Sequence, residues 1–129
     1  MADDDIPLHA FLGLEVDPGP PAVATLPLTE RVRGAFVPLH GGLYAALADV
    51  ACAAALAAEV DLSEGYPVTT DLGIRFFAQP REGPVRAEAQ LVHRGRRLVG
   101  AECVVLDGLD RQLARVSCSF LLVSTPSAP

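Results

Sequence analysis

An uninterrupted apolar segment between residues 41 and 58 constrains this fold more than any other part of the chain. It runs from Gly41 to about Ala58, lacks proline, consists mostly of alanine and leucine, and has no polar face. A helix that is apolar all round is buried in a protein core or in a membrane. Asp49 is the only charged residue between Leu43 and Ala58, and a carboxylate at a bilayer centre costs about 2.5–3.5 kcal/mol. We therefore predict a helix buried within its own protein, with no membrane partner.

The segments on either side of this helix are predicted to be mainly strands. Before it we expect a short helix at Ile6–Leu12, a proline-rich turn at 18–21, and a strand at Ala22–Leu28 that is followed by a loop to Leu39. After it, a loop at Ser63–Pro67 precedes four strands in meander order, Val68–Phe77, Val85–His93, Leu98–Leu106 and Gln112–Val123.

One helix cannot cover both faces of a sheet, so the fold class is α+β, with a curved antiparallel sheet wrapped around one long buried helix. The other face and the edges of that sheet would need covering, which favours an oligomer. We predict a single domain over residues 1–129, ordered from about 6 to 123, with residues 1–5 and 124–129 as frayed tails.

Charge excludes some partners and favours others. The formal net charge is -6, which argues against nucleic acid as a partner. Residues 75–97 nevertheless contain six arginines and two glutamates, a local charge of 6 − 2 = +4. A basic stretch in an acidic chain suits a small anionic ligand.

Composition also predicts the compartment. No cysteine forms a CxxC or CxxH pair, so no metal site is expected, and buried free thiols are the favoured interpretation of Cys52, Cys103 and Cys118. The acidic start Met1–Asp5 is not followed by the apolar run of a secretory signal, so a cytoplasmic location is expected. The absence of lysine and asparagine beside abundant alanine is typical of a bacterial, GC-rich genome.

Two features of the helix could carry chemistry. His40-Gly41-Gly42 stands at its entrance, where glycine allows close approach and the unpaired N–H groups could form an oxyanion hole; the alternative is a simple turn into the helix. Asp49 in apolar surroundings could be a general base or nucleophile; the alternative is a carboxylate satisfied by an arginine or a backbone N–H.

The spacing of these two features predicts a shared site. Gly41 and Asp49 are eight residues apart, or about 12 Å along a helix, so one helix cannot direct both groups onto one carbonyl. Two antiparallel helices can, because each Asp49 then lies beside the start of the other helix. If both residues are catalytic, the site belongs to two subunits, and the positive end of the partner helix helps keep Asp49 ionised.

The run His40–Asp49 resembles the HGG-x(6)-D helix signature of hotdog-fold thioesterases of the phenylacetic-acid type. Thr69–Phe76 and Gln79-Pro80 resemble that family's next strand, and Arg94–Arg97 lies where the family has a basic hairpin. The similarity extends from about residue 26 to 123. It implies a hotdog fold that pairs into homodimers with shared sites, and usually into a tetramer formed as a dimer of dimers.

The resemblance also implies a function, hydrolysis of a medium-chain or aryl acyl-CoA without metal or redox cofactor, CoA being part of the substrate. Gly41 N–H would polarise the thioester carbonyl, Asp49 would act as base or nucleophile, His40 would support the oxyanion side, and Thr69 would hold the water. The expected contacts of CoA are Gly42, Arg81, Arg94, Arg96 and Arg97, since arginine suits phosphate groups.

One departure from the family pattern keeps alternatives open. Many members carry an asparagine in the loop before HGG, but this chain has none, and its loop reads Arg31-Val32-Arg33-Gly34-Ala35-Phe36. A non-catalytic acyl-CoA-binding hotdog protein is therefore the main alternative. A hotdog hydratase acting on acyl-CoA or acyl-carrier protein is a further one, for which His40 is the only well-placed histidine.

Overall fold

The protein is represented by a computed structural model that describes residues 6–63 and 65–124. The predicted tails, residues 1–5 and most of 124–129, lie outside the described residues. The elements, in chain order, are α1 (Pro7–Leu12), β1 (Glu15–Asp17), β2 (Ala22–Leu26), a 3-10 turn (Glu30–Val32), α2 (Gly41–Glu59), β3 (Gly65–Phe76), β4 (Val85–Arg94), β5 (Leu98–Leu106) and β6 (Gln112–Ser124).

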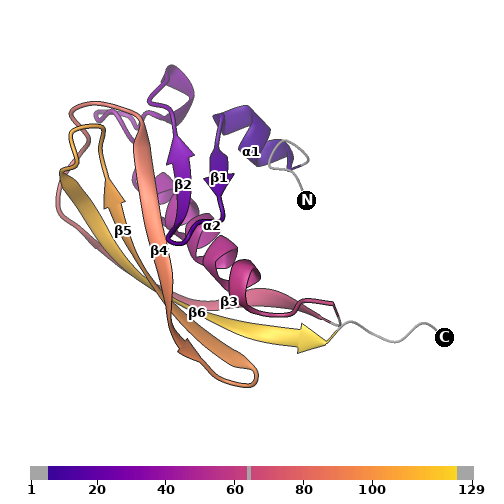
Figure 1. The fold of residues 1–129 in the computed structure, drawn as a ribbon. Helices are drawn as coiled ribbons and strands as arrows, with labels where there is room; N and C mark the ends of the chain where they lie inside the picture. The colour runs from indigo at the N-terminus through magenta and orange to yellow at the C-terminus, as the bar shows by residue number, and fades with distance from the viewer. Residues whose placement is uncertain (1–5, 64, 125–129) are drawn as a thin grey trace.

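The strands form one antiparallel sheet that curves around α2. Their order is β1-β2-β4-β5-β6-β3, so β1 and β3 are the two edges. In Figure 1 the long helix crosses one face of the sheet, and α1 lies beside β1 near the start of the chain. The α+β class and the single long helix predicted from the sequence are confirmed.

The predicted meander is correct for β4, β5 and β6 but wrong for β3. This strand pairs with β6 along its whole length, from Gly65 opposite Ser124 to Phe76 opposite Ala114. The chain must therefore cross from one edge of the sheet to the other side of β5 and β6 before it starts β4. As a result the strand that follows the helix ends up at an exposed edge of the sheet.

The start of β3 and a short additional strand also differ from the prediction. Gly65–Pro67 was expected in a loop, yet it begins β3; Pro67 is tolerated because an edge strand does not need every N–H for pairing. The three-residue strand β1 was not predicted, and it pairs with β2 across the proline-rich turn, with Glu15 opposite Thr25. Three residues are too few for alternation to be recognised in a sequence.

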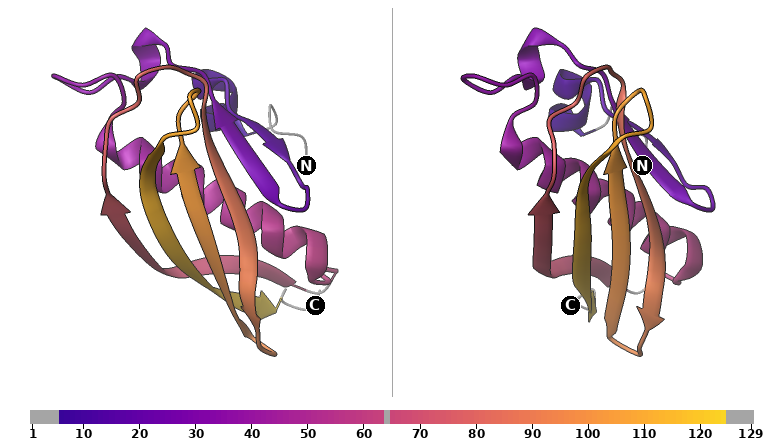
Figure 2. Two further views of the ribbon diagram at one scale, coloured as in Figure 1. Left: turned by 60° about the vertical axis from the view of Figure 1, so that its left-hand side comes forward. Right: turned by 90° about the vertical axis from the view of Figure 1, so that its left-hand side faces the viewer.

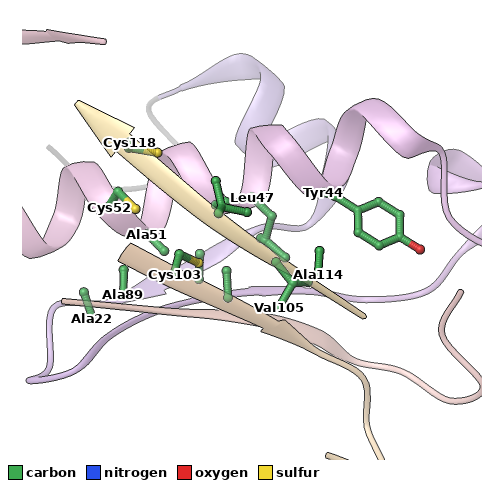
Figure 3. Close-up of a cluster of buried hydrophobic side chains, with 14 of the residues drawn as sticks. Ala22, Tyr44, Leu47, Ala51, Cys52, Ala89, Cys103, Val105, Ala114 and Cys118 are labelled. Atoms are coloured by element: carbon green, nitrogen blue, oxygen red, sulfur yellow. The ribbon is translucent and has the colours of Figure 1, made fainter. Parts of the chain in front are cut away.

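The core lies between α2 and the inner face of the sheet. Figure 3 shows the helix above the strands, with small side chains where the two layers meet. The buried helix residues are Tyr44, Leu47, Ala48, Ala51, Cys52, Ala55 and Leu56. Strand residues with alternating burial face them, as in β2, where Ala22, Ala24 and Leu26 are buried. Alanine and cysteine at these positions let the helix approach the sheet closely.

Within one chain, α2 is buried on the side that faces the sheet. Among the described residues α2 is the one helix long and apolar enough to cross a membrane by length and composition, and 39% of its most apolar 18-residue stretch is buried. The core helix of a globular protein can have the same length and composition. The opposite side of α2 is half-buried or exposed. It consists of Asp49 and the small residues Ala45, Ala46, Val50, Ala53, Ala54, Ala57 and Ala58.

Candidate active site

Asp49 lies on the half-buried side of α2 and has a defined hydrogen-bond partner. The hydroxyl of Thr69, on the edge strand β3, donates to Asp49 Oδ1 at 2.7 Å. No arginine forms an ion pair with Asp49 among residues 6–63 and 65–124. The sequence alternative of an arginine-neutralised carboxylate is therefore wrong for the described part of the chain. Asp49 and Thr69, which the family resemblance places in one site, are therefore in contact.

A β-bulge in β3 brings Thr69 to Asp49. The pairing of β3 with β6 shifts between Thr69, which lies opposite Phe120, and Asp71, which lies opposite Ser119. Thr70 is the extra residue, and its hydroxyl donates to the Ser119 carbonyl at 3.2 Å. Cross-strand partners share a face of the sheet, so Thr69 shares the inward face of Phe120. A regular strand would have placed Thr70 there instead, as bulges commonly re-aim side chains next to sites.

An open groove adjoins Asp49 on the side of α2 that the sheet leaves uncovered. Its volume is about 1270 Å³, and it runs from Asp49 along the helix toward Ala58 and Leu62. The other walls come from α1, β1 and β3, and Pro67 lies on the β3 side. Apart from Asp49, His9 and Glu15, the lining is apolar, so the groove suits an apolar group that is attached beside Asp49.

The start of α2 is capped by its own histidine. His40 Nδ1 accepts the N–H of Gly42 at 2.9 Å, so Nδ1 has no hydrogen and the ring N–H is at Nε2. Gly41 is the first helical residue, and a Cβ added there would meet nothing within 4 Å. Among the described hydrogen bonds, none uses the Gly41 N–H. Gly41 is exposed and its N–H has no partner among the described residues, so this N–H is available as an oxyanion donor.

A side chain from beyond β3 fixes the approach to this helix start. The amide of Gln79 accepts the N–H of Leu39 and donates to its carbonyl, both at 3.0 Å. Leu39 itself is fully buried. Gln79 belongs to the Gln79-Pro80 pair that resembles the family pattern, but the sequence does not predict that it binds the residue before His40. Only the structure shows this contact, because 40 residues separate Gln79 from Leu39 in the sequence.

The loop that lacks the family asparagine has its arginines engaged elsewhere. The guanidinium of Arg31 donates to the Phe11 carbonyl at 3.0 Å and stacks over the Phe11 ring at 5.0 Å. Arg33 pairs with Glu30 and also donates to the Gly34 carbonyl at 3.1 Å. These contacts tie the loop to α1 and to the 3-10 turn, and they give the two arginines structural roles.

The four arginines predicted to contact CoA do not form one cluster within a chain. Arg81 precedes β4, whereas Arg94, Arg96 and Arg97 lie at or after its end. The ten residues of β4 separate the two groups by about 33 Å. Arg96 and Arg97 line a small hollow beside the start of β3. The basic stretch seen in the sequence is thus divided between opposite ends of the sheet.

Comparison with known proteins identifies what this arrangement is similar to. The family model described as Thioesterase superfamily matches residues 39–114. ComA2 of Bacillus subtilis, a protein named as an esterase, is 27% identical over 114 residues, which are 87% of this chain and 90% of ComA2. The matched segment contains His40, Gly41, Asp49 and Thr69.

Solved structures confirm the predicted hotdog-type fold. A thioesterase variant from Staphylococcus aureus superposes with a TM-score of 0.85 at 21% identity, covering 92% of this chain and 99% of that one. A protein from Bacillus halodurans that was crystallised with CoA gives 0.82 at 24% identity, covering 90% and 75%. At these identities the two structures establish the fold alone.

Proposed function

This chain belongs to the Thioesterase superfamily, and we propose that it hydrolyses acyl-CoA to the free acid and CoA at a site shared between two subunits. It is an enzyme of the thioester-hydrolysing class. The observation that carries the finer proposal is the hydrogen bond from Thr69 to a carboxylate that has no cationic partner among the described residues and opens on an apolar groove.

The proposed reaction divides between two helices. Asp49, with Thr69 as its hydrogen-bond donor, accepts a proton from water as that water attacks the thioester carbonyl. The Gly41 N–H of the partner subunit stabilises the negative charge that develops on the carbonyl oxygen. Collapse of the intermediate breaks the carbon–sulfur bond, and the CoA thiolate leaves and is protonated. Direct attack by Asp49, which would form an anhydride that water then hydrolyses, uses the same geometry.

The described surfaces support pairing of two copies. The edge strand β3 is 12 residues long, and an exposed strand of this length is normally covered. The adjoining side of α2 carries alanines that permit close approach of a second helix. An antiparallel pair would cover both at once, and would bring Gly41 of one subunit to Asp49 of the other, as the 12 Å spacing requires. A dimer of dimers remains part of the proposal.

The substrate proposal rests on the groove and on charge. The apolar groove beyond Asp49 suits a medium-chain or aryl acyl group, in keeping with the phenylacetic-acid type of thioesterase. CoA carries phosphates that arginine binds well, and the similar protein from Bacillus halodurans was crystallised with CoA. Because Arg81 is far from the other three arginines, we propose that a dimer supplies them to one CoA from different subunits. We further propose that the reaction needs no cofactor and that the protein is located in the cytoplasm.

The first test removes the carboxylate. Asp49→Ala and Asp49→Asn should lower thiol release from a panel of acyl-CoAs by about 10²-fold or more, while circular dichroism and Tm stay near those of the wild type. Single-turnover hydrolysis in labelled water separates base from nucleophile, since label in Asp49 would indicate an anhydride. An unchanged rate would remove Asp49 from the mechanism. Tight acyl-CoA binding without turnover, unaffected by Asp49→Ala, would support the non-catalytic alternative suggested by the missing asparagine.

The second test removes a single N–H. Gly41 is the first residue of α2 and has a negative φ, and proline is well tolerated at this helix position. Gly41→Pro therefore deletes the oxyanion donor and retains the helix, whereas Gly41→Ala adds a side chain and keeps the N–H. We expect kcat to fall by about 10²-fold for the proline variant and by much less for the alanine variant. Equal activity of the two variants would contradict the oxyanion role.

A further inference from the structure

Phe36 is the most exposed large apolar side chain among the described residues, with 97% of its surface accessible. It lies in the loop between the 3-10 turn and α2, and its neighbours Ala35 and Val37 are exposed as well. The other exposed aromatic rings of the described chain are covered by about half. A ring held fully in water contributes none of the free energy that burial would give it.

The loop is braced so that the ring points away from its own chain. The N–H of Gly34 donates to the Val37 carbonyl at 2.9 Å, which closes a tight turn with Phe36 at its tip. At the base of the loop, the His40 N–H donates to the Val32 carbonyl at 2.8 Å. In both views of Figure 2 the loop projects past β3, at the edge of the sheet where a second copy is proposed to dock.

Under the proposed pairing of helices, the loop would lie over the partner's groove. In an antiparallel helix pair with Gly41 opposite Asp49, the chain that precedes Gly41 runs along the partner helix toward its C-terminal end. The groove beside Asp49 extends in that same direction for about 13 Å, to Ala58. Phe36 is five residues before Gly41, a separation that can span at most about 17 Å. The ring is therefore within reach of the groove, whose alanines leave room for it.

We infer that Phe36 of each subunit covers the partner's apolar groove between Ala53 and Ala57, and thereby determines which acyl groups are accepted. The inference rests on the proposed function, because it needs the shared dimer. A ring at this position forms the outer wall of the groove, away from the reacting carbonyl. It would contact the distal part of a medium-chain or aryl acyl group, and it would not reach an acetyl group held beside Asp49.

The kinetic test compares acyl groups of different length. Phe36→Ala should lower kcat/KM for octanoyl-CoA and phenylacetyl-CoA by about tenfold to a hundredfold, mainly through KM, because contacts remote from the carbonyl contribute to binding throughout the reaction. The kcat/KM for acetyl-CoA should stay the same. Leu109→Ala is the matched control, since Leu109 is a 54% exposed apolar residue on the turn after β5; it should leave all three substrates unaffected.

A second test does not depend on activity. Benzoylphenylalanine is incorporated at position 36, isotopically labelled and unlabelled subunits are mixed, and the protein is irradiated. We expect crosslinks between labelled and unlabelled chains that map by fragmentation to residues 53–57. Crosslinks confined to one chain, or mapping to another surface, would overturn the inference, as would a Phe36→Ala effect that is equal for all acyl lengths. If the wild type hydrolyses no acyl-CoA, the proposed function fails, while the crosslinks still decide where Phe36 docks.

Discussion

Replacing Asp107 with alanine should destabilise the protein through three backbone groups. Asp107 is the one buried polar or charged residue among the buried residues described, and none of its surface is accessible. Its Oδ1 accepts the N–H groups of Leu109 at 2.9 Å and Arg111 at 3.0 Å, and its Oδ2 accepts the N–H of Arg81 at 3.0 Å. The Arg111 guanidinium donates from 3.4 Å. The carboxylate thus joins the β5–β6 turn to the segment that leads into β4.

The size of the effect follows from these contacts. A buried N–H left without a partner costs about 1–3 kcal/mol, but water can reach part of this site because the turn residues Gly108–Asp110 are exposed. We therefore expect a loss of about 3 kcal/mol for Asp107→Ala, which corresponds to about 10 °C in Tm for a domain of this length. Asp107→Asn should lose less, because its oxygen can still accept at Oδ1 while its NH₂ faces the N–H of Arg81.

The same contacts predict a pH dependence. Burial raises the pKa of Asp107, but the N–H groups of Arg81, Arg111 and Leu109 together lower it by more, so its pKa lies below the ordinary value. A group whose pKa is lower in the folded state stabilises the protein above its unfolded pKa of about 3.9 and loses that contribution as the pH falls through the folded pKa. The stability difference between wild type and Asp107→Ala should therefore be largest near neutral pH and shrink below about pH 4.

Urea unfolding followed by circular dichroism measures this difference, at one protein concentration because an oligomer's stability depends on concentration. A difference at pH 7 below about 0.5 kcal/mol would refute the assignment of three dependent N–H groups. A difference that stays constant from pH 5 to pH 2 would refute the claim that the charged form carries the stabilisation.

Three further predictions concern the site and the core. Thr69→Val should lower kcat by about tenfold or more, with Tm nearly unchanged, because a hydrogen bond to a charged group is lost. Thr69→Ser keeps the hydroxyl and should restore the rate. Equal rates for the wild type and both variants would remove the Thr69–Asp49 bond from catalysis. His40→Ala should lower the free energy of unfolding in urea by about 1 kcal/mol, because the cap on the Gly42 N–H is lost. His40→Asn, which can also cap the helix, should recover this stability. No recovery would mean that capping is not the cause. Hydrogen bonding to Cys103 and, after it, burial hold the pKa of the Cys52 thiol well above its ordinary value. A thiol reagent should therefore label no cysteine in the folded protein and three after unfolding. Rapid labelling of the native protein would contradict the burial of Cys52, Cys103 and Cys118.

The elements that the sequence predicted well are those defined by local patterns. The bounds of Leu98–Leu106 agree with β5, and Gly41 begins α2 as expected. In both segments the apolar pattern, the flanking glycines and the turn residues predict the same element bounds to within a few positions. The three buried free cysteines were also predicted, because their spacing matches no metal or redox motif.

The contact between Thr69 and Asp49 depends on a feature that no local pattern marks. Thr69 and Thr70 are both β-branched, and either could face the helix until the bulge is known. The resemblance to a family pointed to Thr69, whereas strand alternation from Leu72 and Ile74 would have pointed to Thr70. The position of β3 beside β6 is likewise set by pairing between distant segments, which a count of local signals cannot provide.

Arginines that are close in the sequence are far apart in the fold. Arg81 and Arg94 are 13 residues apart and look like parts of one basic stretch, but the strand between them carries them to opposite ends of the sheet. In a strand each residue adds about 3.3 Å, more than twice the rise of a helix. A charge cluster counted along a sequence therefore predicts a patch only where the chain turns back on itself.

The one charge between Leu43 and Ala58 of α2 is explained by what the fold leaves uncovered. A carboxylate buried without a partner would be costly, yet Asp49 lies on the side of the helix away from the core, half-buried, with one hydroxyl donor from β3. Its carboxylate can therefore stay hydrated in a single chain. Docking a second helix would remove that water, and the same step would bring the positive start of the partner helix beside the carboxylate. Under the proposed pairing, the event that buries Asp49 also supplies the Gly41 N–H, so the carboxylate is desolvated only where it can act.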